Sequence, residues 1–250
     1  MFLLEGFKMK TYLVGTSGWN YDSWKGVFYP EELPRKKWLS YYSQKFPTVE
    51  VNATFYREFR DSTYIKWRDT VLEDFYFVLK APKVITHRYY LKNSSEIIKR
   101  FSKATSNLGN KFGLILLQLA PNTPYNIELL AEALLSFAEP KKVAVEFRNE
   151  KWETDEVKNL LREIGAIYCI VDSPKARLIP CFTSEIGYIR LHGKQRWYDY
   201  DYSDRELKEI TEVAKSGINS GCKQVFIFFN NDVNAYAPRN ANRILEMFGN

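Results

Sequence analysis

Short stretches of this chain alternate apolar and polar residues, and the longer stretches between them repeat apolar residues at helical spacing. The clearest alternation is in residues 142–149, whose positions divide into two faces: Val143, Val145 and Phe147 on one, and Ala144, Glu146 and Arg148 on the other. Its β-branched residues predict a buried strand. An ionised group inside a protein costs several kcal/mol unless it is paired or solvated, so Glu146 and Arg148 must lie in a polar pocket or serve a function.

The same reading predicts eight strands and the helices that alternate with them. The strands are expected at residues 12–16, 48–52, 75–80, 113–119, 142–149, 166–172, 188–192 and 224–229. Helices are expected at 34–45, 62–71, 95–108, 127–137, 153–164, 203–216 and 240–248, with a short apolar piece near 178–182. Ser62 and Ser203 are expected to cap helices at their N-termini, and Gly165 to end one.

Alternating strands and helices predict a parallel sheet, and eight such units in about 250 residues match a TIM barrel, a closed (β/α)8 fold. An open doubly wound sheet is the alternative, but no glycine-rich phosphate-binding turn follows the first strand. No change of composition marks a linker. We therefore predict one α/β barrel domain over residues 11–250, preceded by a short extension at 1–10.

Strand alternation places a polar residue on the inner side near the C-terminal end of every strand from the second to the eighth. These residues are Glu50, Asn52, Lys80, Gln118, Glu146, Arg148, Asp172, Arg190, His192 and Asn230. Because the C-terminal strand ends of a TIM barrel build its active site, we expect these side chains to share one mouth.

The residue types at this mouth predict acid/base chemistry on an anionic substrate. Glu146, His192, Asp172 and Lys80 are the catalytic candidates. The substrate-binding candidates are the anion-binding Arg148 and Arg190, the orienting amides Asn52, Gln118 and Asn230, and the aromatic side chains Trp19 and Tyr56.

Purely structural roles remain open for the same residues. Glu146 and Arg148 could close an ion-pair network with Asp172 and Arg190, and Glu50 could serve only as the partner of Arg190. His192 could be a hydrogen-bonded scaffold residue, and Lys80 could form a simple ion pair, bind an anion or act as an amine nucleophile. His87, on a loop, is expected to lie at the surface or to anchor that loop.

The composition narrows the classes of function. The 250 residues carry a net charge of +6, 45% hydrophobic residues and three scattered cysteines, which predicts a reduced cytoplasmic protein with a sizeable core. The N-terminal segment lacks the apolar run of a signal peptide. Two histidines cannot supply a histidine-rich multi-metal site, but Glu146, Asp172 and His192 could hold one divalent ion. No nucleotide-cofactor, GxSxG or HExxH motif is present.

Several ordered blocks of sequence resemble one family. They are Gly15–Trp19, Gly26–Pro30, Val49–Tyr56, Phe77–Pro82 with Thr86–Arg88, Val145–Arg148, Arg190–Gly193 and Phe229–Asn231. From about Tyr12 to Met247 the chain is similar to the domain-of-unknown-function 72, or YecE-like, family. The resemblance implies a TIM barrel and brings no settled reaction.

Two functions follow as predictions. The first is an enzyme acting on a phosphate- or carboxylate-bearing small molecule at the barrel mouth. The alternative is a nucleic-acid-binding protein or metal-assisted phosphodiesterase, which the basic charge, the loop aromatics and the family's resemblance to endonuclease-IV-type barrels suggest. No membrane partner is expected.

Overall fold

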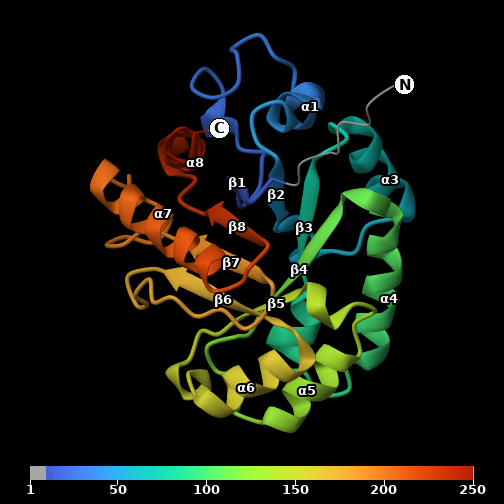
Figure 1. Cartoon of the computed structure of the whole chain (residues 1–250). Coiled ribbons are helices and arrows are strands. Elements are labelled where there is room, and N and C mark those ends of the chain that lie inside the picture. The colour runs from blue at the N-terminus through green and yellow to red at the C-terminus, as the bar shows by residue number, and fades with distance from the viewer. Residues whose placement is uncertain (1–9, 250) are drawn as a thin grey trace, which may run out of the picture.

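Eight parallel strands form one sheet that curls into a barrel with helices around it (Figure 1). The computed structural model describes residues 10–249, so residues 1–9 of the predicted extension lie outside the described residues. The strands are β1 Tyr12–Thr16, β2 Thr48–Val51, β3 Tyr76–Lys80, β4 Phe112–Gln118, β5 Val143–Glu146, β6 Ile167–Asp172, β7 Ile186–Leu191 and β8 Gln224–Phe229. They are hydrogen-bonded in the order β1-β8-β7-β6-β5-β4-β3-β2, which confirms the predicted TIM barrel.

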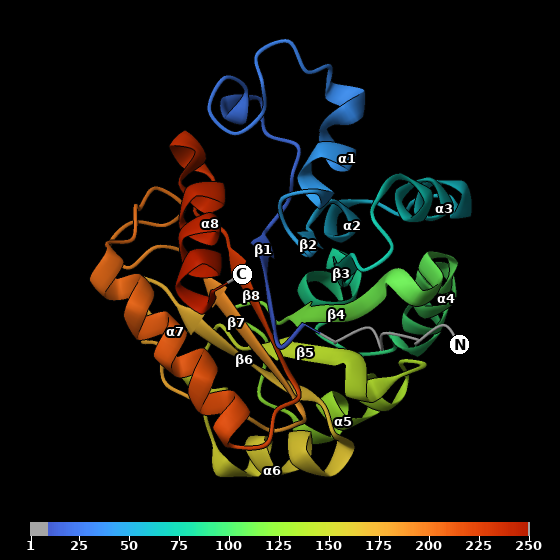
Figure 2. The same ribbon diagram turned by 45° about the horizontal axis from the view of Figure 1, so that its top comes forward.

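The α-helices follow the predicted order with shifted ends. They are α1 Trp38–Ser43, α2 Ala53–Tyr56, α3 Asp61–Thr70, α4 Ser95–Thr105, α5 Ile127–Leu135, α6 Asp155–Ile164, α7 Asp204–Asn219 and α8 Tyr236–Phe248. In Figure 2, α7 and α8 lie beside β7 and β8, whereas α3 and α4 lie near β3 and β4 on the other side. None of the helices in residues 10–249 combines the length and apolar character that a membrane crossing requires.

The helix signals in the sequence were partly right. Ser203 caps α7 through a complete capping box with Glu206, and Gly165 ends α6 in the left-handed conformation with φ 77°. Ser62 does not cap α3, because this helix begins one residue earlier at Asp61. The last helix begins at Tyr236 rather than 240, since Pro238 fits its first turn, where no backbone N–H is needed.

One connection lacks the helix that a regular (β/α)8 barrel has there, and the sequence predicted none. Residues 173–185, between β6 and β7, contain no helix, and the apolar piece near 178–182 has no regular secondary structure. The outer side of β6 is therefore covered by this loop instead of a helix. The short helix α2, directly after β2, was not predicted.

The side chains separate into a lumen layer and an outer layer as strand alternation requires. The lumen layer comprises Leu13, Val78, Leu114, Leu116, Ala144, Ile167, Cys169, Tyr188, Phe226 and Phe228. The outward residues, such as Val49, Val145 and Ile189, pack with the helices in a second and larger cluster. The lumen is thus a packed core below its C-terminal end.

The barrel closes between β1 and β2, where only an isolated bridge from Ser17 to Glu50 joins the two edges. Gly15 allows this close approach, because a Cβ there would lie 2.1 Å from the carbonyl oxygen of Thr48. The hydroxyl of Tyr42, from α1, accepts a hydrogen bond from the Thr16 amide at 2.9 Å and donates one to the Thr48 carbonyl at 3.1 Å. A side chain thus replaces part of the missing strand ladder.

Replacing Tyr42 by Phe should lower the free energy of unfolding by about 1–3 kcal/mol, because the buried Thr16 amide loses its acceptor. Urea denaturation measures the change. Tyr41→Phe is the matched control, since the Tyr41 hydroxyl has no hydrogen-bond partner within residues 10–249. Equal stabilities for the two variants would contradict a role of the Tyr42 hydroxyl in closing the barrel.

Candidate functional site

The floor of the barrel mouth is a carboxylate from β2 paired with a guanidinium from β7. Arg190 donates from Nε to Glu50 Oε2 at 2.9 Å and from Nη2 to Glu50 Oε1 at 2.6 Å. Tyr188 and Ser17 donate hydroxyl hydrogen bonds to the same carboxylate at 2.6 and 2.7 Å. Burial alone would raise the pKa of Glu50, but the charge and hydrogen bonds of Arg190 lower it below its usual value. Glu50 therefore stays ionised.

A second carboxylate, from β5, continues the network upward. Glu146 is fully buried and pairs with Nη1 of Arg190 and with Nε of Arg148, and it accepts a hydrogen bond from Gln118 Nε2 at 2.9 Å. Burial opposes ionisation of Glu146, yet the positive charges of Arg190 and Arg148 hold its pKa well below the ordinary value. This carboxylate accepts hydrogen bonds from Gln118 and Arg190 and pairs in addition with the charge of Arg148. That arrangement favours positioning of the two arginines over the general-base role expected from sequence.

His192 lies against this network as a neutral imidazole. Its Nε2 is 3.2 Å from Arg148 Nη2 and 3.4 Å from Arg190 Nη1, two groups that only donate. Nδ1 lies 3.0 Å from Asn230 Nδ2, which is also a donor, so both ring nitrogens face donor groups and protonation of the ring is disfavoured. Burial and the charge of Arg190 lower the pKa of His192 to about 4.

Lys80, at the end of β3, completes the inner ring. The residue is 9% exposed, and its Nζ lies over the face of Phe55, 4.2 Å from the ring centroid. Within residues 10–249 no carboxylate lies close enough to form an ion pair with it. Burial and the charge of Arg190 lower the pKa of Lys80 to about 8. Lys80 therefore does not form the simple ion pair that was one of its predicted roles.

Asp172 does not join this mouth, contrary to the predicted inward orientation. Ile167, Cys169 and Val171 face the lumen, so alternation turns Asp172 to the outer side of β6. There its Oδ2 accepts a hydrogen bond from the Tyr202 hydroxyl at 2.8 Å, and burial raises its pKa.

The predicted metal-binding set is wrong for the same reason, because its three members do not meet. Glu146 and His192 face the lumen, and Asp172 lies behind the strand. Over the part of the chain that the structure describes, no group of three or more His, Cys, Asp or Glu side chains is arranged to hold a metal ion.

The remaining predicted residues divide between the mouth and other places. Asn52, after β2, keeps its Oδ1 buried with no hydrogen-bond partner among residues 10–249. Tyr56 is 75% exposed next to Phe55, and Trp19 packs edge-on against Trp67 in the outer layer. Trp19 therefore does not line the lumen.

Other residues enter the site that the sequence reading had not assigned to it. Ser17 and Tyr188 bind Glu50, and both could have been found by extending strand alternation from Leu13 and from Arg190. Trp197, in the loop after β7, lies under the guanidinium of Arg148 with Cζ 5.0 Å from its ring centroid. No sequence signal indicates that this loop folds back over the mouth.

His87 also lies near the mouth rather than free at the surface. It belongs to a π-helical turn, Val84–Arg88, and its ring lies 5.0 Å from that of Phe55 in a perpendicular arrangement. Burial and the nearby charge of Lys80 lower its pKa. Phe55 therefore has Lys80 and His87 as neighbours.

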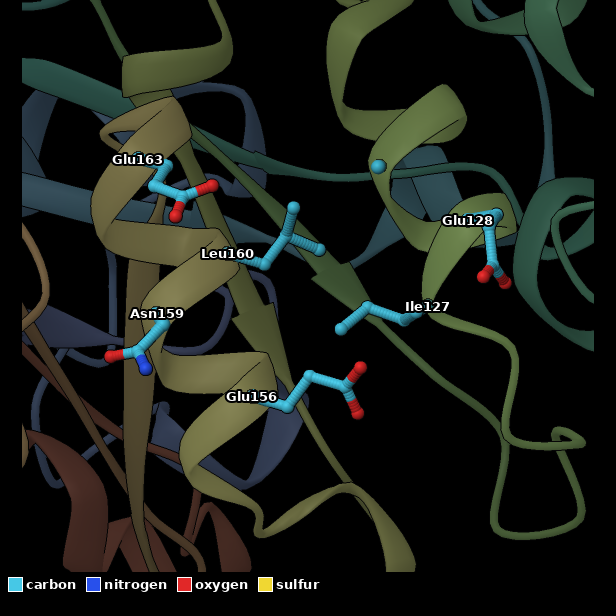
Figure 3. A pocket seen from close by; sticks show the side chains of 7 residues that line it. Ile127, Glu128, Glu156, Asn159, Leu160 and Glu163 are labelled. Carbon is cyan, nitrogen blue, oxygen red and sulfur yellow. The ribbon is translucent and has the colours of Figure 1, made fainter.

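Two hollows in the described part of the protein differ in how they lie relative to the strand-end residues of the barrel mouth. The larger, of ≈ 1160 Å³, runs from Arg148 and Trp197 over β6 beneath the 173–185 loop, which stands in place of the helix of a regular barrel. The other is an open depression between α5 and α6, lined by Glu128, Glu156 and Glu163 (Figure 3). The second lies in the helix layer and contains none of the strand-end residues, whereas the first is lined by Arg148 but not by Glu50, Lys80, Glu146, Arg190 or His192.

Replacing Glu50 by Gln should lower the free energy of unfolding by about 3–5 kcal/mol, because it leaves the buried Arg190 undercompensated. Chemical denaturation measures the change. Glu139→Gln is the control, because the ion pair of Glu139 with Lys142 lies at the surface. Its loss should lower the free energy of unfolding by less than about 1 kcal/mol. Similar small losses in both variants would contradict the central role of the Glu50–Arg190 pair.

Acidification should destabilise the protein through His192. An unfolded histidine takes up a proton near pH 6.5, whereas folded His192 does so only near 4, so the unfolded state binds more protons between these values. The free energy of unfolding should fall by about 2–3 kcal/mol as pH drops from about 6.5 to 4.5. Denaturation at several pH values tests this, and His192→Gln should flatten the dependence. An unchanged slope in that variant would exclude His192 as its source.

Comparison with known proteins identifies relatives of this chain. A relative from Bacillus subtilis (strain 168), the UPF0759 protein YunF, is 25% identical over 268 residues, covering 94% of this chain and 93% of that protein. The UPF0759 protein YecE of Escherichia coli (strain K12) is 27% identical over 168 residues, covering 64% of this chain and 58% of that protein.

Solved structures also include similar proteins. A DUF72 family protein from Thermotoga maritima superposes with a TM-score of 0.88 at 29% identity, covering 96% of this chain and all of that one, 100%. A xylose isomerase domain-containing protein from Salmonella typhimurium shares the fold alone, with a TM-score of 0.53 at 12% identity over 85% of this chain and 93% of that one. The family described as "Protein of unknown function DUF72" matches residues 13–250, and the chain belongs to that family.

Proposed function

We propose that this protein is an enzyme that binds a small phosphate- or carboxylate-bearing substrate at the C-terminal mouth of its barrel. The observation that carries the proposal is the balance of charge there. The charges that act on Lys80 are those of Arg190, Glu146, Glu50 and Arg148. Together with Lys80, three positive groups face two carboxylates at neutral pH, which leaves one positive charge without a partner. A bound anion would supply it.

Arg148 is the group best placed to hold that anion. Its side chain is 18% exposed, whereas Arg190 below it is 1% exposed and fully engaged by Glu50 and Glu146. Contact with Trp197 and the ion pair with Glu146 fix the guanidinium in one orientation. A fixed guanidinium suits bidentate binding of a carboxylate or phosphate, because little side-chain freedom is lost on binding.

The protonation states assign the acid/base work within this mouth. Glu146 stays ionised and His192 neutral at pH 7, so neither exchanges a proton readily there. Lys80, with a pKa of about 8, is the group closest to the working range of a general acid or base. Asn52 offers a buried acceptor, Oδ1, for a substrate hydroxyl.

Replacing Arg148 by Gln should weaken the binding of inorganic phosphate and oxalate by about 10–100-fold, because a charge-assisted hydrogen bond contributes about 1.5–3 kcal/mol. Isothermal titration calorimetry measures the affinities, and a panel of phosphorylated and carboxylated metabolites tests turnover. Arg239→Gln is the control, since Arg239 pairs with Asp201 at the surface. Equal binding by the wild type and Arg148→Gln, or no binding by either, would rule the proposal out.

Nucleic-acid binding stays a prediction. Its affinity should fall linearly with the logarithm of salt concentration and with a steep slope, because each phosphate contact releases counterions. A single small anion should show a far weaker dependence. The same titrations, repeated at several salt concentrations with a short oligonucleotide, separate the two functions.

A further inference from the structure

Two lysines of the described residues are buried, and they differ in one respect. Lys111 is 6% exposed, and its Nζ donates to the carbonyl oxygens of Arg68 and Val71 at 3.0 Å each, with Glu73 Oε2 at 3.5 Å. Lys80 has no such acceptor within residues 10–249, and its Nζ faces an aromatic ring. An ammonium group carries three donors, so burial without acceptors disfavours the charged form. Lys111 is therefore held as an ammonium ion, whereas Lys80, with a pKa of about 8, is positive at neutral pH but gives up its proton more readily.

The neighbours of Lys80 also favour a reactive amine. Burial and the charges of Arg190 and Arg148 lower the pKa of Lys80 to about 8, although Glu146 and Glu50 act in the opposite direction. The face of Phe55 takes the place of part of its water shell. His87, a neutral imidazole whose ring lies perpendicular to that of Phe55, adds a group that can carry a proton. A lysine in a partly dry pocket next to cations, whose ammonium group loses its proton close to neutral pH, is the arrangement that activates an amine as a nucleophile.

We propose that Lys80 forms an imine with the carbonyl carbon of a substrate whose carboxylate or phosphate is bound by Arg148. This inference rests on the proposed anion site and specifies the substrate class as an anionic aldehyde or ketone. Lys80 ends β3 and Arg148 follows β5, so both side chains enter the same mouth from separate strands. One substrate can therefore span them.

The covalent step balances without any further reactant. The Lys80 ammonium group first gives a proton to a base, for which His87 is the candidate. The amine nitrogen then forms a bond to the carbonyl carbon. The carbonyl oxygen takes a proton from that nitrogen and becomes a hydroxyl. The C–O bond then breaks as that hydroxyl takes up the proton held by the base and leaves as water, and a C=N bond remains. In sum, one ammonium and one carbonyl group give one iminium ion and one water.

An iminium ion withdraws electrons from the adjacent carbon. It therefore eases the breaking of a C–H or C–C bond next to the former carbonyl, which is the chemistry of lyases and isomerases that use a lysine. Neither Glu146 nor His192 needs to change its charge in this scheme. Their fixed states keep Arg148 and Arg190 in place while Lys80 reacts.

Borohydride trapping tests the inference on the full chain. The protein is incubated with pyruvate or glycolaldehyde phosphate, reduced with sodium borohydride, digested and mapped by mass spectrometry. We expect a reduced adduct on Lys80, and labelling by acetone, which lacks the anionic group, to be weaker by about 10-fold or more. Lys111→Arg should retain the adduct, whereas Lys80→Arg, which keeps the charge but has no nucleophile, should lose it. Lys80→Gln serves as the second variant if Lys80→Arg does not fold.

The outcomes separate this inference from the proposed function. Absence of the Lys80 adduct with both anionic probes, or labelling spread evenly over surface lysines, overturns the imine while Arg148-dependent phosphate binding still stands. Labelling of Lys80 that is equal for pyruvate and acetone and unchanged in Arg148→Gln overturns the anion site. Selective labelling of Lys80 that weakens in Arg148→Gln supports both.

Discussion

The guanidinium of Arg190, buried between two carboxylates, is the interaction on which the mouth of this barrel depends. It joins β7 to Glu50 of β2 and to Glu146 of β5, so three strands that are not sheet neighbours are tied across the lumen. Such a triad adds little to stability over a well-packed apolar core, but losing one member leaves a charge buried without compensation. The network therefore fixes the position of each strand end more than it stabilises the fold.

The network divides the mouth into a floor whose charges are satisfied and a rim whose charges are not. Glu50 is closed off by Arg190, Tyr188 and Ser17, and Ser17 reaches it because the β1–β2 seam brings the two edges together. On the rim, Lys80 and Arg148 keep a net positive charge toward the opening. The anion binding that we propose therefore requires no rearrangement of the protein, since the floor has already fixed the geometry of the charges.

The missing helix after β6 leaves a hollow beside that strand that a regular barrel would not have. The loop of residues 173–185 replaces that helix, and the space beneath it is continuous with Arg148 and Trp197. The loop after β7 folds back so that Trp197 lies against Arg148 and against His192, at 5.4 Å between ring centroids. Both loops follow strands at the C-terminal end, where variation leaves the packed lumen below unchanged.

The sequence by itself determined the barrel and the inward orientation of Lys80, Glu146 and Arg190, because strand alternation is a local property with a period of two residues. The same rule failed at Asp172, where a shift of one position exchanges the two faces of the strand. Only the tertiary structure decided which charges neutralise one another, since the partners come from strands far apart in sequence. It left Lys80 without an acceptor and Lys111 with three, a difference that follows from distances across the folded chain.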